Sequence, residues 1–312
     1  MDRPAGTVPA AIVRAVTAGM EATAPTIARA REREGDGRPA LASARWLVAL
    51  ALVALGAIAL PGGSPAWAQE LRIASYNMER LGQDRKDYGA LARVVAGFDL
   101  VAAEEVMNGQ GMASILALLG PGWSDAMSDT GEGSSRYQEH FGFFYSSSRV
   151  ALVQKLGEFP RVSEFFRPPF GAQFRSRDSG LLFNLVACHI VYGKTERGRV
   201  AEISHLGEVY RYFEGMTGNH AVTMIVGDFN EERSETFGSL AALDDREVIP
   251  PQATTIGPRG PAHAYDHMFL PPGLLPLEVR AGVDYWTTDY GRVRKLVSDH
   301  FPVYVVLRTG KG

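Results

Sequence analysis

Residues 223–230 read TMIVGDFN, an apolar run that ends in a glycine and is followed by Asp228 and Asn230. A short run of β-branched and other apolar residues predicts a strand, and the polar residues after it predict a loop at the strand end. The same order recurs along the chain, at Asn77, at Glu104 and Glu105, at His189, and at Asp299 and His300. In layered α/β proteins the loops at strand ends carry functional side chains and lie close together. The pattern therefore predicts one site that gathers these residues.

Short apolar runs alternate with helical patterns from residue 71 onward. We expect strands over 71–76, 100–104, 141–145, 181–188, 222–226, 265–270 and 303–307. Helical periodicity predicts helices over 88–96 and 199–213, and apolar residues recur in the second at steps of three and four. Residues 250–262 and 271–276 are rich in Pro and Gly and predict loops. The whole indicates one α/β domain with a layered sheet core.

The first 68 residues differ from the rest. Arg45 precedes the apolar run WLVALALVALGAIAL over 46–60, which is followed by PGGSP and then by the small-residue pattern Ala66-Trp67-Ala68. A positive flank, an apolar core and a small-residue site are the three parts of a secretory signal peptide. We expect an N-terminal extension with signal peptide over 1–68 and a catalytic domain over 69–312 that is secreted or periplasmic. An uncleaved N-terminal anchor is the alternative; after cleavage we expect no stable membrane association.

Residues 69–312 carry an excess of acid. Residues 1–68 hold 7 of the 32 Lys and Arg and 5 of the 35 Asp and Glu, which leaves a net charge of −5 for the remainder. Proteins that hold nucleic acid passively usually present a strongly basic face. The excess instead suggests carboxylates that collect metal ions. Cys188 is the single cysteine, so an intramolecular disulfide is impossible, and its apolar surroundings predict a small buried side chain.

The chemistry available at the strand ends suits phosphoryl transfer. Phosphodiester cleavage needs charge compensation on the phosphoryl oxygens, an activated water and help for the leaving oxygen. Glu, Asp and Asn oxygens are hard ligands that fit Mg²⁺ or Mn²⁺, with Ca²⁺ also possible, and the sequence has no Cys and His cluster with zinc spacing. Two histidines with carboxylates nearby could move protons at the phosphoryl group.

The motifs together resemble the endonuclease/exonuclease/phosphatase superfamily. LRIASYN (71–77), LVAAEEV (100–106), VGDFN (226–230), Tyr265-Asp266 and Ser298-Asp299-His300 occur in the order typical of that superfamily. The resemblance implies a four-layered α/β sandwich, in which two β-sheets pack face to face and helices flank them. The segment SRYQEHFGFFY (135–145) resembles deoxyribonuclease I and the catalytic subunit of cytolethal distending toxin.

The resemblance also implies roles for individual residues. Glu139 would orient His189 and Asp266 would orient His300, and these two histidines would be catalytic. Asp228 and Asn230 would contact the scissile phosphate, a second metal or the attacking water. Which histidine is the general acid stays open, and Asp228 is a rival for the base.

The remaining implied roles concern metal and substrate. Glu105 would be the principal metal ligand, assisted by Asn77 and Asp299, with Glu104 turned away from the site. Tyr137 and Arg167 resemble positions that contact the minor groove and the backbone of DNA. We assign no catalytic role to His140, His205, His220 and His263.

Three functions compete. The first is an exported, monomeric endonuclease that hydrolyses DNA, and the second is a phosphatase or phosphodiesterase acting on lipid headgroups or sugar phosphates. The third is a binding protein that has lost catalysis, which the retention of every candidate ligand and both histidines argues against. Two departures from deoxyribonuclease I are visible: no cysteine follows VGDFN, and His267 replaces the Arg expected after Tyr265-Asp266.

Overall fold

The computed structural model describes residues 70–310, apart from 84, 135–136, 194, 219–220 and 233. The expected extension and signal peptide over 1–68 lie outside the described residues and stay a prediction. Among the residues that are described, no helix has the length and apolar character needed to cross a membrane.

The first of two large sheets has seven strands. It runs in the order β14 (Glu278–Val283), β15 (Val303–Arg308), β1 (Glu70–Leu81), β2 (Leu100–Val106), β5 (Tyr137–Ser146), β3 (Trp123–Met127), and β4 (Glu132–Ser134) pairs with β5 off this path. The β1–β2 pair is parallel and the other neighbours are antiparallel. The parallel pair brings the ends of β1 and β2 to the same edge, with Asn77 opposite Glu104.

The second sheet has six strands. Its order is β10 (Arg246–Glu247), β13 (Asp266–Leu270), β9 (Val222–Asp228), β8 (Leu182–His189), β7 (Phe170–Ser176), β6 (Val150–Glu158). Here β8 and β9 are parallel, with His189 opposite Asp228, and β13 runs antiparallel to β9, with Asp266 opposite Asp228. Three strands thus deliver three polar residues side by side.

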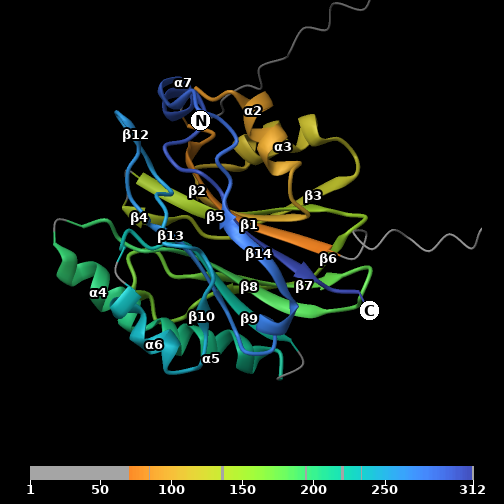
Figure 1. Cartoon of the computed structure of the whole chain (residues 1–312), viewed down its shortest axis with the longest axis vertical. Coiled ribbons are helices and arrows are strands. Elements are labelled where there is room, and N and C mark those ends of the chain that lie inside the picture. Colours follow the sequence, from red (N-terminus) through yellow and green to blue (C-terminus); the bar gives the residue numbers. More distant parts are fainter. Residues whose placement is uncertain are drawn as a thin grey trace, which may run out of the picture. The chain divides into compact units, whose positions relative to one another are not determined.

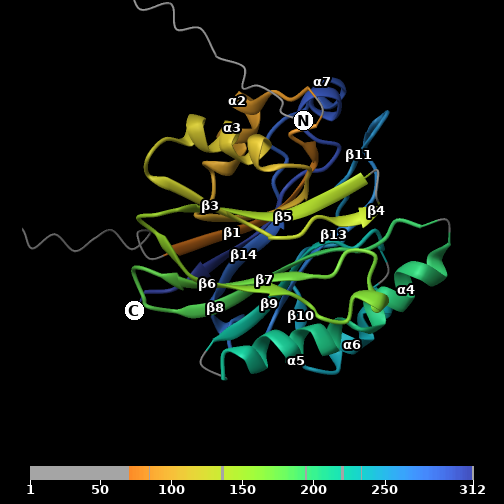
Figure 2. The ribbon, with the colours of Figure 1, turned by 180° about the vertical axis from the view of Figure 1, so that it is seen from behind.

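Helices cover the outer faces of both sheets, which gives the four layers seen in Figures 1 and 2. The first sheet is covered by α2 (Tyr88–Val95), α3 (Gly109–Leu119) and α7 (Tyr290–Leu296). The second is covered by α4 (Glu196–Ser204), α5 (Leu206–Met216) and α6 (Gly238–Ala241). Three 3₁₀ turns lie at Val162–Glu164, Ser234–Phe237 and Leu275–Leu277. The expected four-layered α/β sandwich is confirmed.

The core has three layers because each sheet is buried on both faces. Between the sheets, Phe143 packs against Phe170 and Phe174, with ring centroids 5.6 and 5.3 Å apart. Two further apolar clusters lie between each sheet and its helices. Strands buried on both faces have nearly continuous apolar sequences, as in LVAA before Glu104.

The helix expected over 199–213 is wrong in one respect, because it consists of two helices. His205 ends α4 and begins α5, and its ring lies against Phe165. The apolar stripe continues through the break, since Ile203, Leu206 and Phe213 are all buried. Periodicity predicted the buried face correctly. It did not predict the interruption, because a change of only a few backbone angles is enough to break the helix.

Candidate active site

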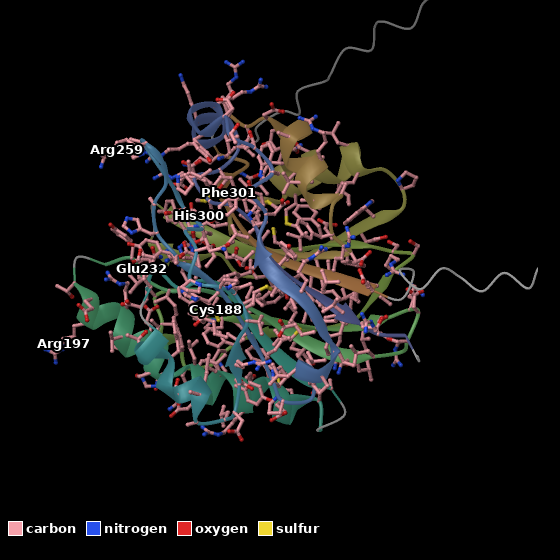
Figure 3. All side chains as sticks on the ribbon, in the orientation of Figure 1. Cys188, Arg197, Glu232, Arg259, His300 and Phe301 are labelled. Carbon is pink, nitrogen blue, oxygen red and sulfur yellow. The ribbon has the colours of Figure 1, made fainter. Side chains whose placement is uncertain are left out.

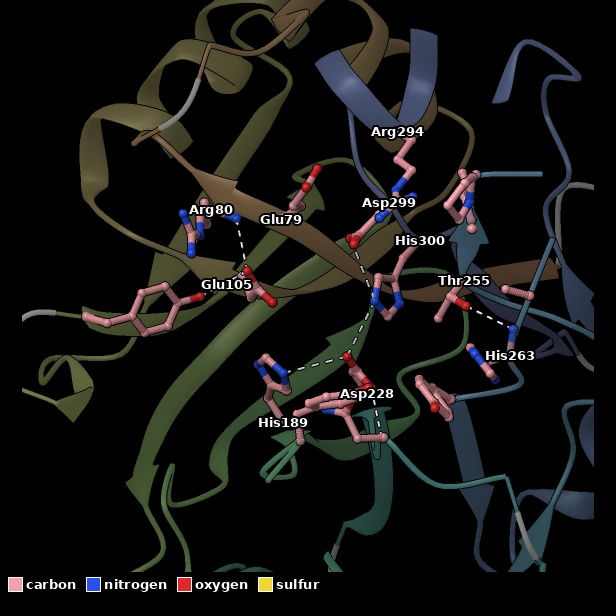
Figure 4. A pocket seen from close by; sticks show the side chains of 18 residues that line it. Glu79, Arg80, Glu105, His189, Asp228, Thr255, His263, Arg294, Asp299 and His300 are labelled. Carbon is pink, nitrogen blue, oxygen red and sulfur yellow. Dashed lines mark hydrogen bonds and ion pairs between the residues drawn. The ribbon is translucent and has the colours of Figure 1, made fainter. Parts of the chain in front are cut away.

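A cavity of about 600 Å³ opens where the two sheets meet at their polar edge. Four carboxylates line it, from Glu79, Glu105, Asp228 and Asp299, together with both candidate histidines (Figure 4). Glu105 and Asn77 come from the first sheet, whereas His189 and Asp228 come from the second. The site is therefore shared between the sheets, and their packing sets its geometry.

Asp228 lies between His189 and His300. Its Oδ2 atom is 3.6 Å from Nε2 of each ring. On the far side of each ring, a buried carboxylate contacts Nδ1. Glu139 Oε1 lies 2.8 Å from His189 Nδ1, and Asp266 Oδ2 lies 2.8 Å from His300 Nδ1. Each histidine is thus fixed in orientation by one carboxylate and presents its other nitrogen to the shared Asp228.

Asp228 owes its position to the glycine before it. Gly227 has φ +144°, and a Cβ atom there would lie 1.9 Å from the backbone oxygen of Cys188, so no other residue fits. The backbone N–H of Asn230 donates to Asp228 Oδ1 at 2.9 Å, and Nδ2 of Asn77 donates to Oδ2 at 3.1 Å. The Asn230 side chain is buried and donates to the Ile190 carbonyl at 2.9 Å.

Arg167 lies behind His189 and not in the lining of the cavity. It is 6% exposed, its Nε is 2.6 Å from Glu139 Oε1, and it donates to the carbonyls of His189 and Ile190 at 3.0 and 3.1 Å. Through these contacts the Arg167 guanidinium is paired with atoms of the protein itself. The expected contact of Arg167 with DNA is therefore at odds with its surroundings, and we assign it a positioning role, holding Glu139 and the end of β8.

Tyr137 does line the cavity. Its hydroxyl donates to Glu105 Oε2 at 3.0 Å and to Glu139 Oε2 at 3.3 Å, and its ring lies under the Arg80 guanidinium, 5.4 Å from the centroid. It links the candidate metal ligand to the carboxylate that orients His189. A contact of this ring with substrate stays a prediction.

Glu105 and Glu104 point in opposite directions. Glu105 lines the cavity with φ +54°, a strained backbone for a residue that is not Gly or Asn, and such strain is most common at functional sites. Glu104 is fully buried and accepts a hydrogen bond of 2.8 Å from the Ser75 hydroxyl. Burial raises the pKa of Glu104 well above its usual range.

The residues at the cavity fit a hard divalent cation. Burial raises the pKa of Glu105, but His189 and the hydrogen bond from Asn77 outweigh it, so the net pKa is below the ordinary value and the group stays ionised. Oxygens of Glu105, Glu139 and a nitrogen of His189 also lie within 4.8 Å of one another. In that grouping, Glu139 is already in ion pairs with both Arg167 and His189, at 2.6 and 2.8 Å. We therefore favour Glu105 with Asn77 and Asp299 as the ligands.

Both histidines have raised pKa values. Burial lowers the pKa of His300, but Asp266 and Asp228 outweigh it and hold the pKa well above the ordinary value. Burial and Arg167 lower the pKa of His189, but Glu139 outweighs them, so its pKa is also raised. Burial raises the pKa of Asp228, and Asp266 adds to that effect against the lowering by His300. His300 is the group held most firmly as an imidazolium.

Several supporting residues were not predicted. The Thr254 hydroxyl donates to Asp266 Oδ2 at 2.5 Å, and the Ser298 hydroxyl donates to the Asn77 carbonyl at 2.6 Å while accepting the backbone N–H of His300 at 3.0 Å. His263, to which we gave no role, lines the cavity, as do Arg80, Tyr192 and Arg294. Only the Ser298 position carried a signal, through its place in the SDH motif.

His267 is buried away from the cavity lining. Its Nδ1 is 2.5 Å from Glu247 Oε1 and its Nε2 is 2.7 Å from the Glu231 carbonyl oxygen. Both neighbours are acceptors, so the ring carries a proton on each nitrogen and ties β13 to β10 and to the segment after Asn230. The residue that replaces the expected Arg thus keeps a positive charge at that place.

Comparison with known proteins gives two sequence relatives. A deoxyribonuclease from Thioalkalivibrio sp. is 34% identical over 260 residues, which cover 76% of this chain and 71% of the relative. Human deoxyribonuclease-1-like 1 is 27% identical over 264 residues, which cover 77% of this chain and 85% of the relative. No protein-family model matches the sequence.

The fold also matches solved structures. An endonuclease/exonuclease/phosphatase family protein from Bacteroides thetaiotaomicron superposes with a TM-score of 0.56 at 18% identity, over 78% of this chain and 99% of that one. At this identity the likeness concerns the fold alone.

Proposed function

We propose, on the premise that this chain belongs to the deoxyribonuclease family of the endonuclease/exonuclease/phosphatase superfamily, that it cleaves DNA with the help of a hard divalent cation. As a member of that family it is a phosphodiester hydrolase. The observation that carries the proposal is Asp228 with a histidine 3.6 Å away on either side, each histidine backed by its own carboxylate.

The three groups divide the proton transfers between them. The raised pKa of Asp228 makes it a stronger base, and it accepts the proton of the attacking water. His300, held as an imidazolium by Asp266 and Asp228, donates a proton to the leaving oxygen. His189, backed by Glu139, stabilises charge on a phosphoryl oxygen.

The cation would be held by Glu105 with Asn77 and Asp299. Mg²⁺ or Mn²⁺, with Ca²⁺ as the third candidate, would supply neutralisation of phosphoryl charge and polarisation of the phosphoryl oxygen. The support is the donor set: ionised Glu105 and its neighbouring carboxylates at the cavity are hard oxygen ligands.

A plasmid-nicking assay tests the proposal. Nicking should require Mg²⁺ or Mn²⁺ and stop with a chelator, and His189→Ala and His300→Ala should each lower the rate by about 10²-fold or more. His140→Ala is the matched control, because His140 lies outside the cavity lining and bonds Ser128. Cleavage that survives chelation would contradict the metal, and near wild-type turnover in either folded variant would remove that histidine.

The same assay separates DNA from the alternative substrates. Bis-p-nitrophenyl phosphate, sphingomyelin and sugar phosphates are incubated beside the plasmid under identical conditions. We expect plasmid and bis-p-nitrophenyl phosphate to be hydrolysed. Preference for sphingomyelin or a sugar phosphate would replace the nuclease with a lipid or sugar phosphate hydrolase.

We also propose that the protein is exported and processed after Ala68, which the Arg45, apolar run and Ala66-Trp67-Ala68 series supports. N-terminal sequencing of protein recovered outside the cytoplasm should begin at Gln69. An intact Met1 species confined to the cytosol would contradict the proposal.

A further inference from the structure

Four carboxylates line the cavity, although under the proposed function its substrate is a polyanion. Glu79, Glu105, Asp228 and Asp299 all line it. A bound cation and the histidines offset this charge at the reacting phosphate, but a strand also carries phosphates on either side of it that need positive partners of their own. Polynucleotide binding relies on cations placed at those neighbouring phosphates. If the substrate is a polymer, such cations must lie around the cavity.

Helix α7 supplies two of them. Its sequence, YGRVRKL, buries Val293 against the first sheet and leaves Arg292, Arg294 and Lys295 exposed. Arg294 lines the cavity and extends toward Asp299 in Figure 4. Arg292 pairs with Asp87 at 2.9 Å, whereas Arg294 and Lys295 have no acidic partner within the part of the chain that the structure describes.

A stabilising effect on α7 itself is the simpler explanation for these charges. Basic residues in the last turn of a helix interact favourably with its dipole, but at exposed positions this contribution is small. It also does not account for the placement of Arg294, since any exposed face of the last turn would serve the dipole equally. The orientation of Arg294 into the cavity lining is the observation that needs another cause.

A hairpin beside α7 carries a further exposed arginine. β11 (Ile256–Gly257) pairs with β12 (Gly260–Pro261), and the turn between them exposes Arg259, whose side chain extends outward in Figure 3. The hairpin packs on the start of α7, because a Cβ on Gly260 would lie 3.4 Å from the ring of Tyr290. Its first strand also lines the cavity. The hairpin and α7 thus form one wall of the cavity, with Arg259 exposed in the turn of the hairpin and Lys295 exposed on α7.

We propose that Arg259, Arg294 and Lys295 form a basic rim that binds phosphates of a nucleic-acid strand beside the scissile bond. The rim selects polymeric nucleic acid over small phosphodiesters, because a small substrate has no flanking phosphates to offer. The inference rests on the proposed function for the identity of the polyanion. Arg80, which lies over Tyr137 on another part of the lining, gives the strand a cation elsewhere in the same cavity.

Equilibrium binding tests the rim apart from catalysis. A fluorescent duplex oligonucleotide is titrated with the His300→Ala protein and with the same protein carrying Arg259→Gln, Arg294→Gln and Lys295→Gln, over a series of salt concentrations. Each lost phosphate contact should reduce the slope of log K against log[salt] by about one. Arg211→Gln is the matched control, because Arg211 is exposed on α5, which covers the other sheet. An unchanged slope in the triple variant, or an equal change in the control, overturns the rim.

Kinetics with two substrates tests selection. In the otherwise wild-type protein, the ratio of kcat/KM for DNA to that for bis-p-nitrophenyl phosphate should fall about tenfold or more in the triple variant. An equal fall for both substrates would assign these residues to folding or to the reacting phosphate and overturn the rim. If the wild type cleaves neither substrate, the proposed function fails, and the binding slopes alone then decide the rim.

Discussion

At the scale of single residues, Glu104 and Glu105 are neighbours in one strand with different roles. Glu105 is the candidate metal ligand, and Glu104 is a buried structural acid. Glu105→Gln removes a charge from the candidate metal ligand while keeping its shape, so metal affinity should fall and excess metal should partly restore activity. Glu104→Gln changes a side chain that is buried outside the cavity lining and can still accept from Ser75, so its effect on metal affinity should be small. Calorimetric titration of Mn²⁺ and thermal unfolding of both variants measure the difference. A larger loss of metal affinity in Glu104→Gln would show that the two faces are assigned the wrong way round.

The pH profile reports on His300. Asp266 and Asp228 raise its pKa, so the imidazolium persists above the ordinary value and activity should fall as pH rises through the raised pKa. Asp266→Asn removes one of the two charges and should move this alkaline limb to lower pH. The rate of plasmid nicking across pH measures it. Thr254→Val removes a hydroxyl that donates to Asp266 and accepts the backbone N–H groups of Tyr265 and Asp266, but it leaves the Asp266 charge in place, so it should move the limb less. A limb that stays in place in Asp266→Asn would exclude His300 as its source.

The residues of the site divide into those that sequence could reveal and those it could not. Asn77, Glu105 and Asp228 were predictable because each follows an apolar strand, and strand ends converge at an edge. The contact of Arg167 with DNA stays a prediction. Its pairing with Glu139 could not be foreseen, because an Arg near a site can face substrate or protein and only packing decides between the two. Arg294 carried no signal, since its nearness to Asp299 in space depends on how a seven-residue helix rests on the sheet.

At the scale of elements, the segment after α6 holds an acid that links stability to pH. Burial raises the pKa of Asp245 to about 7, and Glu214 of α5 and Asp244 add to the effect. The folded carboxyl therefore keeps its proton up to about pH 7, while the unfolded one loses it near its ordinary value. Stability is full at low pH, declines as pH rises between those two values, and stays reduced above 7.

Asp245→Asn should remove this decline. The variant should gain about 1–2 kcal/mol over wild type at pH 8, less than the full shift implies because the site is partly solvated, and little at pH 4. Chemical denaturation at the two pH values measures the gain. Asp125→Asn is the control, being an exposed acid on β3. A gain of the same size at both pH values would point to packing and not to ionisation.

Element boundaries depended on how strong each local signal was. The strand β9 was predicted nearly to the residue, because it is buried on both faces and its apolar run stops at Gly227, one residue before the strand ends at Asp228. By contrast, α7 was missed, since seven residues with one buried side chain leave no periodicity to detect. The four-layered arrangement came from the resemblance. The order of strands in the sheets was not predicted, because alternation in sequence fixes which face is buried but not which strand is the neighbour.

At the scale of the whole described unit, catalysis depends on how the two sheets pack. Asn77, Glu105 and the start of β15 belong to one sheet, and His189, Asp228 and Asp266 belong to the other. The cavity exists only where these edges meet. The apolar layer between the sheets therefore stabilises the fold and also sets the distance between the two halves of the site.

Phe143→Ala tests this dependence on packing. Phe143 is fully buried between the sheets against Phe170 and Phe174, so its truncation should cost about 3–5 kcal/mol of unfolding free energy. Activity per folded molecule should also fall, because the cavity left behind lets the sheets shift. Leu118→Ala on α3 removes a side chain that is 59% exposed and should change neither quantity appreciably. Unfolding curves measure the loss of folded protein. Rates measured well below the unfolding midpoint measure the loss of active-site geometry. Full activity per folded molecule in Phe143→Ala would mean that the loops at the strand ends, and not the layer between the sheets, hold the two halves of the site in place.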